Sequence, residues 1–207
     1  MGLWTDRVLP HIVDKSLSTG GVMNERQLAC ARLEGRVLEI GFGSGLNIEK
    51  YPTTVESVSA VEPSDLAWRM SADRRAASPA PITRSGLDGQ SLGEPDESFD
   101  TVLSTFTLCT IPDVERALRE VNRVLRPGGT LVFLEHGLAP EPGVVRWQRR
   151  LDPLQHLVAG GCHLSRDVPA LVRSAGFEIV ALEQRYLPGP RVGRPWTYGY
   201  SGSATRS

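Results

Sequence analysis

The sequence predicts an α/β fold in which helices cover both faces of a doubly wound, mostly parallel β-sheet. Short apolar segments alternate with amphipathic helical segments along most of the chain, which is the pattern of successive β-α-β units. A glycine-rich turn follows the first apolar segment, and an acidic residue ends the second. Ligands of such sheets bind outside the carboxyl ends of the strands, so these two features predict where a ligand lies.

The segment before the first strand, residues 1–35, predicts an N-terminal helical cap. Apolar residues recur at helical spacing from Trp4 to Leu17, with Pro10 placed to kink or divide the helix. A second helical piece covers residues 23–33. The cap either closes over a ligand or covers the sheet, and the sequence leaves both open.

The first strand, residues 37–40, is an apolar run typical of a strand buried on both faces. Gly41, Gly43 and Gly45 follow at alternate positions. A backbone that turns sharply against a ligand needs residues without a Cβ, so these glycines predict a ligand-binding loop. Glu39 lies within the strand, where a carboxylate is costly unless it is paired.

The second strand, residues 57–62, ends at Glu62. An acidic side chain in this place accepts hydrogen bonds from both hydroxyls of a ribose. The alternative is a solvated carboxylate before Pro63, and the glycine loop upstream favours the ribose. The dinucleotide fingerprint G-x-G-x-x-G is not matched, because Leu46 stands at the position of its last glycine.

The remaining elements continue the alternation up to the fifth strand and then depart from it. We expect helices over residues 46–51, 65–77 and 114–125, the last stopped by Pro127-Gly-Gly129, and strands over 82–85, 99–104 and 130–134. A helical insertion then covers 139–167, followed by a helix over 168–175 and strands over 177–184 and 195–203, joined by a Pro/Gly-rich turn at 188–193. The sum is a seven-stranded sheet with an antiparallel last strand, in a single domain over residues 1–207.

The composition is that of an ordinary soluble protein, with 40% hydrophobic and 23% charged residues among 207. The net charge of -1 gives no electrostatic reason to expect nucleic acid or an anionic membrane as a partner. Cys30, Cys109 and Cys162 are odd in number and far apart, so we expect neither a disulfide framework nor a metal site. No apolar run approaches the ~20 residues that span a bilayer, and no signal peptide is visible, so we expect a cytoplasmic protein.

Several motifs resemble those of the class I S-adenosylmethionine-dependent methyltransferases. The pattern E-x-G-x-G-x-G over residues 39–45 is similar to their motif I, although a glycine-rich loop that merely turns the chain is an alternative. Residues 87–100 resemble their G-D-A-x-x-L-P-F-P-D-x-S-F-D stretch, with Leu87 in place of its glycine and Glu94 in place of an apolar residue, and 125–129 match L-x-P-G-G. The resemblance implies a Rossmann-like fold, S-adenosylmethionine as cofactor and S-adenosylhomocysteine as product.

The same resemblance implies which residues contact the cofactor. Asp88 takes the place of the acid that accepts from the adenine amino group, with the backbone of Gly89 near the ring nitrogens. For Asp88 the alternative is an Asx-turn. The implied cofactor-binding residues are Glu39, Gly41, Gly43, Gly45, Asn47, Glu62, Pro63, Asp88, Gly89, Thr105 and Phe106.

The second half resembles the thiol S-methyltransferases more specifically, and the similarity covers roughly residues 36 to 202. The human members of that family are membrane-associated and begin with a hydrophobic anchor that this sequence lacks, so we expect no stable membrane anchor. The residues that carry the resemblance are Thr107-Leu-Cys109, Glu135-His136, Trp147-Gln148, Leu151-Asp-Pro153, His156-Leu157, Gly161-Cys162, Leu164, Arg166, Arg194-Pro195 and Tyr198-Gly-Tyr200.

Methyl transfer to a thiol needs a thiolate held in line with the methyl group. The candidate catalytic residues are Asp152, His156 and His136, and the candidate pocket walls are Trp147, Cys162 and Arg166. Asp152 and His156 lie one helical turn apart and would share a face. Asp152 before Pro153 is also a typical helix start, which would make Asp152 an N-cap, and both interpretations remain open.

The leading functional prediction is methylation of a small-molecule thiol or sulfide. The alternatives are C-, O- or N-methylation of a quinone, phenol or lipid headgroup, and a cofactor-binding module without turnover. Nucleic acid is not expected as a substrate, because the charge is balanced and no Asn/Asp-Pro-Pro-Tyr motif occurs. The sequence does not determine the acceptor, the pathway or the oligomeric state.

Overall fold

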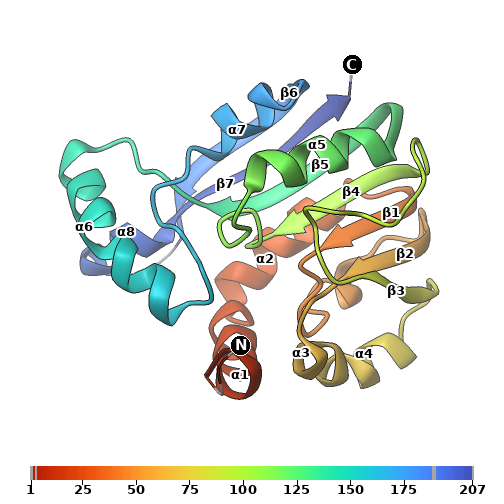
Figure 1. Ribbon diagram of the computed structural model, residues 1–207, viewed down its shortest axis with the longest axis horizontal. Coiled ribbons are helices and arrows are strands. Elements are labelled where there is room, and N and C mark those ends of the chain that lie inside the picture. The colour runs from red at the N-terminus through yellow and green to blue at the C-terminus, as the bar shows by residue number, and fades with distance from the viewer. Residues whose placement is uncertain (1, 3, 188–189, 207) are drawn as a thin grey trace.

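Seven strands form one sheet in the computed structural model, which describes residues 2, 4–187 and 190–206. Their order across the sheet is β3-β2-β1-β4-β5-β7-β6 (Figure 1). The strands are β1 Gly35–Ile40, β2 Val55–Val61, β3 Ile82–Gly86, β4 Phe99–Thr105, β5 Leu125–His136, β6 Phe177–Tyr186 and β7 Tyr198–Arg206. The pairs from β3 to β5 are parallel, and β7 runs antiparallel to both β5 and β6. The predicted mostly parallel sheet with an antiparallel last strand is therefore confirmed.

Helices lie on both faces of this sheet, with α5 and α7 in front of it and α2 behind it in the view of Figure 1. The cap helices and the helices α6 and α8 lie toward the carboxyl ends of the central strands (Figure 1). The helices are α1 Leu9–Leu17, α2 Gly20–Cys30, α3 Asp65–Met70, α4 Ala72–Ala76, α5 Val114–Val124, α6 Pro142–Val158, α7 Val168–Ser174 and α8 Arg194–Thr197. A π-helical turn at Trp4–Val8 and 3-10 turns at Ile48–Lys50 and Arg191–Gly193 complete them.

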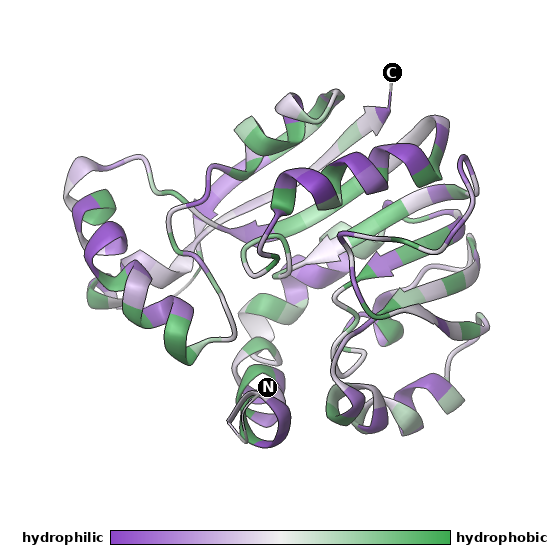
Figure 2. Ribbon diagram, viewed as in Figure 1, coloured by the Kyte–Doolittle hydropathy of each residue, from purple (hydrophilic) through white to green (hydrophobic). Residues whose placement is uncertain are grey.

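Two apolar clusters, one on each side of the sheet, make up the core. Alternate side chains of β5 belong to different clusters: Leu131 and Phe133 pack with α5, whereas Val132 and Leu134 pack with β1 and Phe42. Side chains of a strand alternate between faces, so burial on both faces requires the unbroken apolar runs that the sequence shows. Figure 2 shows the central strands mostly in the hydrophobic colour, while the outward side of α5 is hydrophilic.

The start of β5 differs from the prediction. Helix α5 ends at Val124, and β5 begins at the next residue, so Pro127-Gly-Gly129 lies inside the strand and does not stop the helix. Leu125 already pairs with Phe99 of β4, and the register shifts before Thr130 pairs with Thr101. This irregularity accommodates a proline that cannot donate to the ladder.

Two further boundaries also differ. The helix expected over 65–77 is divided at Ser71, whose hydroxyl donates to the carbonyl of Trp68 at 2.7 Å, as serine commonly does where a helix bends. The strand expected from residue 195 begins at Tyr198, because Pro195 stands near the start of the short helix α8, where a missing N–H costs nothing. Pro10 stands near the start of α1 and divides the N-terminal helix, which is one of the two expected outcomes. Residues 1, 3, 188, 189 and 207, which belong to the expected cap, turn and C-terminal end, lie outside the described residues.

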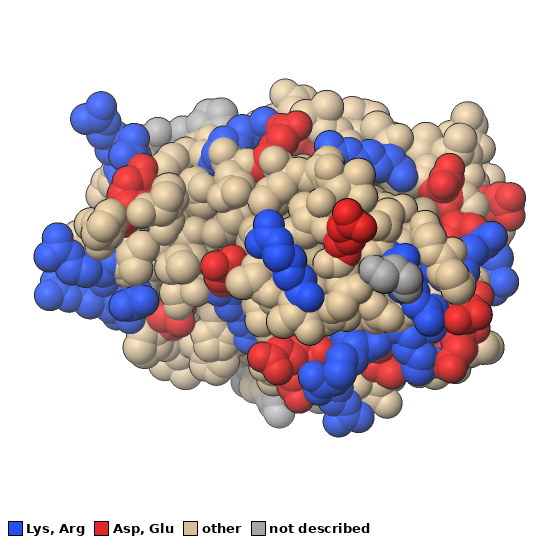
Figure 3. Space-filling model, turned by 90° about the horizontal axis from the view of Figure 1, so that it is seen from above, with Lys and Arg blue, Asp and Glu red and all other residues tan. Residues whose placement is uncertain are grey.

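The surface carries both signs of charge. On the face of Figure 3, basic and acidic side chains both occur across the molecule. Within the described part of the chain, no helix combines the length and the apolar character needed to cross a bilayer.

Candidate active site

The glycine loop after β1 folds back onto the end of β2. The backbone N–H groups of Gly41 and Phe42 donate to the carbonyl of Val61, at 2.9 and 3.2 Å. The N–H of Gly43 donates to a carboxylate oxygen of Glu62 at 2.6 Å. All three alternate glycines of the loop have positive φ angles, between 59° and 78°, which only glycine adopts without strain.

The glycines serve different purposes. A Cβ on Gly41 would lie 2.0 Å from the Thr107 hydroxyl oxygen, and one on Gly45 would lie 2.6 Å from Ile48 Cδ1, so neighbouring side chains exclude a larger residue at both. At Gly43 the nearest atom to such a Cβ is the carbonyl oxygen of Gly41, 3.9 Å away. The space above Gly43 is therefore open, and a ligand can lie against its backbone.

Glu39 is the centre of a buried polar cluster beneath this loop. One of its oxygens accepts from the Asn47 amide at 2.9 Å, and the other accepts from the Tyr51 hydroxyl. Burial raises the pKa of Glu39 to about 7, against the opposing effect of these two hydrogen bonds. The cluster fixes the loop from below, and the Glu39 side chain is 1% exposed.

Arg26 of α2 joins this cluster from the cap. Its guanidinium donates to Asn47 Oδ1 at 2.7 Å and to Thr105 Oγ1 at 2.8 Å, and it lies 5.3 Å from the centre of the Phe106 ring. Sequence reasoning missed Arg26, because an arginine within a helical segment is usually a surface residue. Phe106 has a φ of 53°, an uncommon conformation for a side chain of this size.

The two predicted acidic ligands are placed differently. Glu62 is 5% exposed and accepts from the N–H groups of Gly43 and Ser64, and burial raises its pKa. Asp88 is exposed, and its Oδ1 accepts from the backbone and side-chain nitrogens of Gln90, which together lower its pKa. Asp88 thus forms the Asx-turn that the sequence offered as the alternative. Gly89 is buried against Ile40, and Pro63 is exposed.

Two hollows that share lining residues lie at the glycine loop and beside it. A small one of about 70 Å³ follows the glycine loop, and a cavity of about 610 Å³ lies between the cap and the helix α6. Both are bordered by Val13, Leu17 and Phe106. We call the larger one the acceptor cavity, because a second reactant there lies next to a ligand of the glycine loop.

Three groups able to bind or activate a thiol meet at the wall of the acceptor cavity. His136 Nε2 lies 2.9 Å from Cys162 Sγ, and Cys162 Sγ lies 3.8 Å from Cys109 Sγ. Contact with Cys109 and with the His136 imidazole lowers the pKa of Cys162, although burial opposes it. Burial lowers the pKa of His136, but the hydrogen bond to Cys162 and the nearby carboxylate of Glu135 outweigh it, so the net direction is upward.

Asp152 supports the segment that carries Cys162. Its Oδ1 accepts from the Leu164 N–H at 2.5 Å, and its Oδ2 lies 3.2 Å from both the Ser165 hydroxyl and the His163 ring. The helix α6 begins at Pro142 and continues through Pro153. The N-cap interpretation of Asp152 is therefore wrong, because the residue lies in the middle of a helix.

The other predicted residues lie around the cavity. His156 Nδ1 contacts the Gly161 carbonyl at 3.1 Å, and its ring packs 4.7 Å from that of His163. Arg166 donates to the carbonyls of Leu108 and Pro112 and so joins the insertion to the loop after β4. Among the described residues that border the acceptor cavity are His136 and Cys162, but not Asp152, His156, Trp147 or Arg166. Trp147 borders another surface hollow, beside Pro195 and Trp196.

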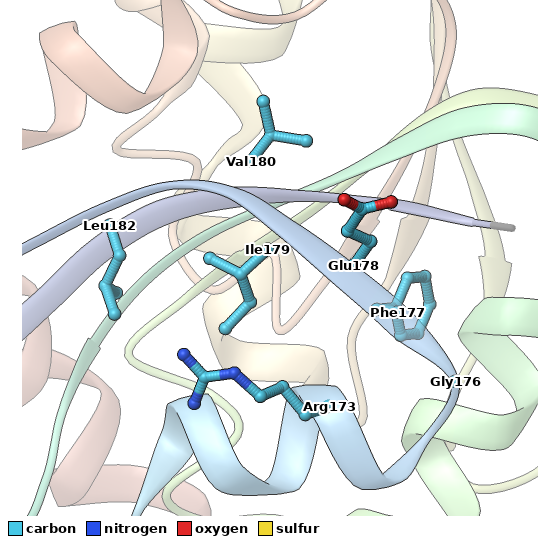
Figure 4. A pocket seen from close by; sticks show the side chains of 7 residues that line it. All are labelled: Arg173, Gly176, Phe177, Glu178, Ile179, Val180 and Leu182. Carbon is cyan, nitrogen blue, oxygen red and sulfur yellow. The ribbon is translucent and has the colours of Figure 1, made fainter.

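A further hollow of about 670 Å³ lies between α7 and β6, far from the glycine loop in the fold. In Figure 4, Ile179 and Leu182 point from β6 toward α7, and Arg173 lies beneath them. Its lining includes a single acid and a single base, Glu178 and Arg173. It brings together no set of groups suited to methyl transfer.

Comparison with known proteins agrees with this site. Residues 38–133 match the family described as "Methyltransferase domain". Over 173 residues the chain is 34% identical to thiol S-methyltransferase TMT1A of Homo sapiens, a match that covers 80% of this chain and 69% of the human protein. The chain belongs to this family of S-adenosylmethionine-dependent methyltransferases. Phosphatidylethanolamine N-methyltransferase of Cereibacter sphaeroides is 37% identical to the methyltransferase over 108 residues, 49% of this chain and 51% of that protein.

A solved structure shows the same fold. A methyltransferase of Thermotoga maritima, described as a possible histamine N-methyltransferase, superposes on this methyltransferase with a TM-score of 0.71 at 23% identity, covering 100% of both chains. S-adenosylmethionine is the cofactor of the family. The residues present fit it, because the backbone at Gly43 has room for a ligand and the Glu62 carboxylate, held by two N–H groups, retains lone pairs for further donors.

Proposed function

We propose that this methyltransferase transfers a methyl group to the sulfur of a small-molecule thiol or sulfide. The observation that carries the proposal is the acceptor cavity, which shares a wall with the glycine-loop hollow and is bordered by Cys109, His136 and Cys162. The extended match to a protein named thiol S-methyltransferase supports the same acceptor class.

The lining of the cavity favours a neutral, apolar acceptor. The described residues that border it include Trp4, Leu9, Ile12, Val158 and Trp196, and none of them is Asp, Glu, Lys or Arg. A phospholipid headgroup would bring a phosphate without a cationic partner into this space, which is costly. An alkyl or aryl thiol would instead bury its hydrocarbon part and point its sulfur toward the histidine.

The chain contributes positioning, exclusion of water and proton handling. S-adenosylmethionine supplies an electrophilic methyl group on a sulfonium sulfur. The glycine loop and Glu62 orient it, and the cap and α6 keep water from the reacting atoms. A free thiol of pKa ~8.5 is mostly protonated at neutral pH, so a group must take its proton or stabilise the thiolate. His136 borders the cavity and is the candidate for stabilising that thiolate.

A competition assay tests the proposal. The protein and S-adenosylmethionine are incubated with an alkyl thiol, a phenol, a quinone and phosphatidylethanolamine, and products are identified by mass spectrometry. We expect a methyl thioether as the main product. A Gly43→Val control, with the ligand space filled, should form none. Methylation of oxygen, carbon or nitrogen with the thiol untouched would contradict the proposal.

A further inference from the structure

Three soft ligand atoms from distant parts of the chain converge at the acceptor cavity. Cys109 follows β4, His136 ends β5, and Cys162 follows α6. Their ligand atoms all lie within 4.8 Å of one another. Two thiols and an imidazole form the donor set that zinc prefers, whereas magnesium and calcium prefer oxygen.

The spacing of the two thiols suits one tetrahedral ion. Two thiolates, each about 2.3 Å from a tetrahedral zinc, lie about 3.8 Å apart, and Cys109 Sγ and Cys162 Sγ are 3.8 Å apart. A zinc-bound imidazole nitrogen lies about 3.5 Å from each thiolate. His136 Nε2 and Cys162 Sγ are 2.9 Å apart, so the ring has to move outward by about 0.6 Å when a zinc ion enters.

The two cysteines are held next to each other by groups other than their sulfurs. The N–H of His163, which follows Cys162, donates to the carbonyl of Cys109 at 2.8 Å. Arg166 donates to the Leu108 carbonyl, and Asp152 holds the Leu164 N–H. The backbone therefore fixes the spacing of the thiols independently of a metal, and such preorganisation lowers the cost of binding one.

The site formed by these three residues is also open toward the acceptor cavity. All three residues border the acceptor cavity, and zinc sites with three protein ligands keep a fourth position for water or substrate. We propose that Cys109, His136 and Cys162 bind one zinc ion whose fourth position takes the sulfur of the acceptor thiol. Zinc binding stands on the geometry alone, and the role in activation rests on the proposed function.

The reaction that follows is balanced. The acceptor R–SH replaces a zinc-bound water, forms a zinc–sulfur bond and releases its proton to solvent, because a thiol bound to zinc is deprotonated. Its sulfur then attacks the methyl carbon, and the bond from that carbon to the sulfonium sulfur breaks with its electron pair going to S-adenosylhomocysteine. The new R–S–CH3 thioether is neutral and a weak ligand, so it leaves the ion.

Metal content is the first test. The full chain, purified without chelator or affinity histidines, is measured by elemental mass spectrometry after gel filtration. We expect about one zinc per chain, and more than a tenfold loss in Cys109→Ser, Cys162→Ser and His136→Asn. Cys30→Ser is the matched control, since Cys30 is equally buried in the other apolar cluster, and it should keep its zinc. Absence of metal, stoichiometric copper, or an intact mass that shows a Cys109–Cys162 disulfide in the fresh protein overturns the proposal.

Cobalt substitution is the second test and does not depend on the folding of a variant. Cobalt(II) in the wild-type site should give a thiolate-to-cobalt charge-transfer band, and an alkyl thiol should change the visible d–d bands. A cobalt spectrum without thiolate features overturns the site. If metal-free protein methylates thiols at the full rate, zinc activation is wrong and the proposed function stands. If zinc binds as expected and no thiol is methylated, the zinc site is correct and the proposed function is wrong.

Discussion

At the scale of single residues, Gly41 and Gly43 look alike in sequence and differ in what surrounds them. We expect Gly43→Ala to cost about 1 kcal/mol of stability for its left-handed backbone, and to weaken S-adenosylhomocysteine binding at least tenfold, because the new Cβ enters open ligand space. Gly41→Ala places its Cβ against Thr107 and should mainly destabilise the fold. Calorimetric titration and urea unfolding of both variants check this. If Gly43→Ala binds S-adenosylhomocysteine with wild-type affinity, the cofactor does not lie against this loop.

Glu39 makes the stability of the protein depend on pH. Its pKa is about 7 in the folded state against 4.5 when exposed, so the folded state holds this proton more tightly. The stabilisation is complete below the unfolded pKa and is lost as pH rises through about 7. By linkage we expect the free energy of unfolding to fall between pH 5 and pH 8 by about 2–3 kcal/mol more in wild type than in Glu39→Gln. The free energy of unfolding of both proteins is measured in urea at both pH values. If it falls equally in wild type and in Glu39→Gln, the carboxylate is not desolvated as described.

Sequence reasoning found the residues of the site whose role follows from backbone constraints. Gly41, Gly43 and Gly45 were predictable, because a turn with positive φ admits little else. Arg26 and Cys109 were not, because their places in the site depend on which segments the fold brings together. For the same reason no zinc spacing is visible along the chain, although the three proposed ligands converge in space.

At the scale of elements, the helix α6 and the loop behind it act as one unit through Asp152. We expect Asp152→Ala to lower turnover about tenfold or more by the same factor at every pH, because it releases the Leu164 N–H and lets Cys162 shift. Asp152→Asn keeps an acceptor for that N–H and should recover most of the rate. Cofactor affinity should be unchanged in both. The measurement is a pH–rate profile with one accepted thiol, and a loss that disappears at high pH would make Asp152 a base instead.

The elements themselves were predicted well where burial determines them. Strands β1, β2 and β4 are buried runs, and their predicted bounds differ from the observed ones by no more than a few residues. Apart from the division of a helix at Ser71, two of the errors lie where proline allows two outcomes. Pro127 is tolerated by an irregular strand pairing and Pro195 by a helix start, and neither outcome can be read from local composition.

At the scale of the whole molecule, the cap divides into an anchored part and a loosely attached part. The helix α2 inserts Arg26 into the core, whereas none of residues Leu9–Leu17, all of them described, is buried. Asp14 attaches α1 to the Ser44 hydroxyl at 2.5 Å and to Arg74 at 3.2 Å. Polar contacts of Asp14 therefore attach α1 to the glycine loop and to the helix α4.

We expect Asp14→Ala to speed amide exchange in residues 4–17 and to raise the KM for the acceptor several-fold. Stability should change by about 1 kcal/mol, since the Asp14–Arg74 ion pair is only partly buried. Hydrogen-exchange mass spectrometry and steady-state kinetics measure these effects. Arg69→Ala is the control for loss of a surface charge on the neighbouring helix α3. Unchanged exchange together with an unchanged KM would show that α1 does not close the acceptor cavity.

Val13 and Leu17 border both the glycine-loop hollow and the acceptor cavity. We therefore expect a ligand in either space to order the wall of the other and to make the second binding event less costly. Heterotropic cooperativity follows, and thermodynamic reciprocity requires it to be equal in both directions. An unreactive thioether should tighten S-adenosylhomocysteine by the same factor by which S-adenosylhomocysteine tightens the thioether. The enzyme would then hold its two substrates together more firmly than it holds either alone.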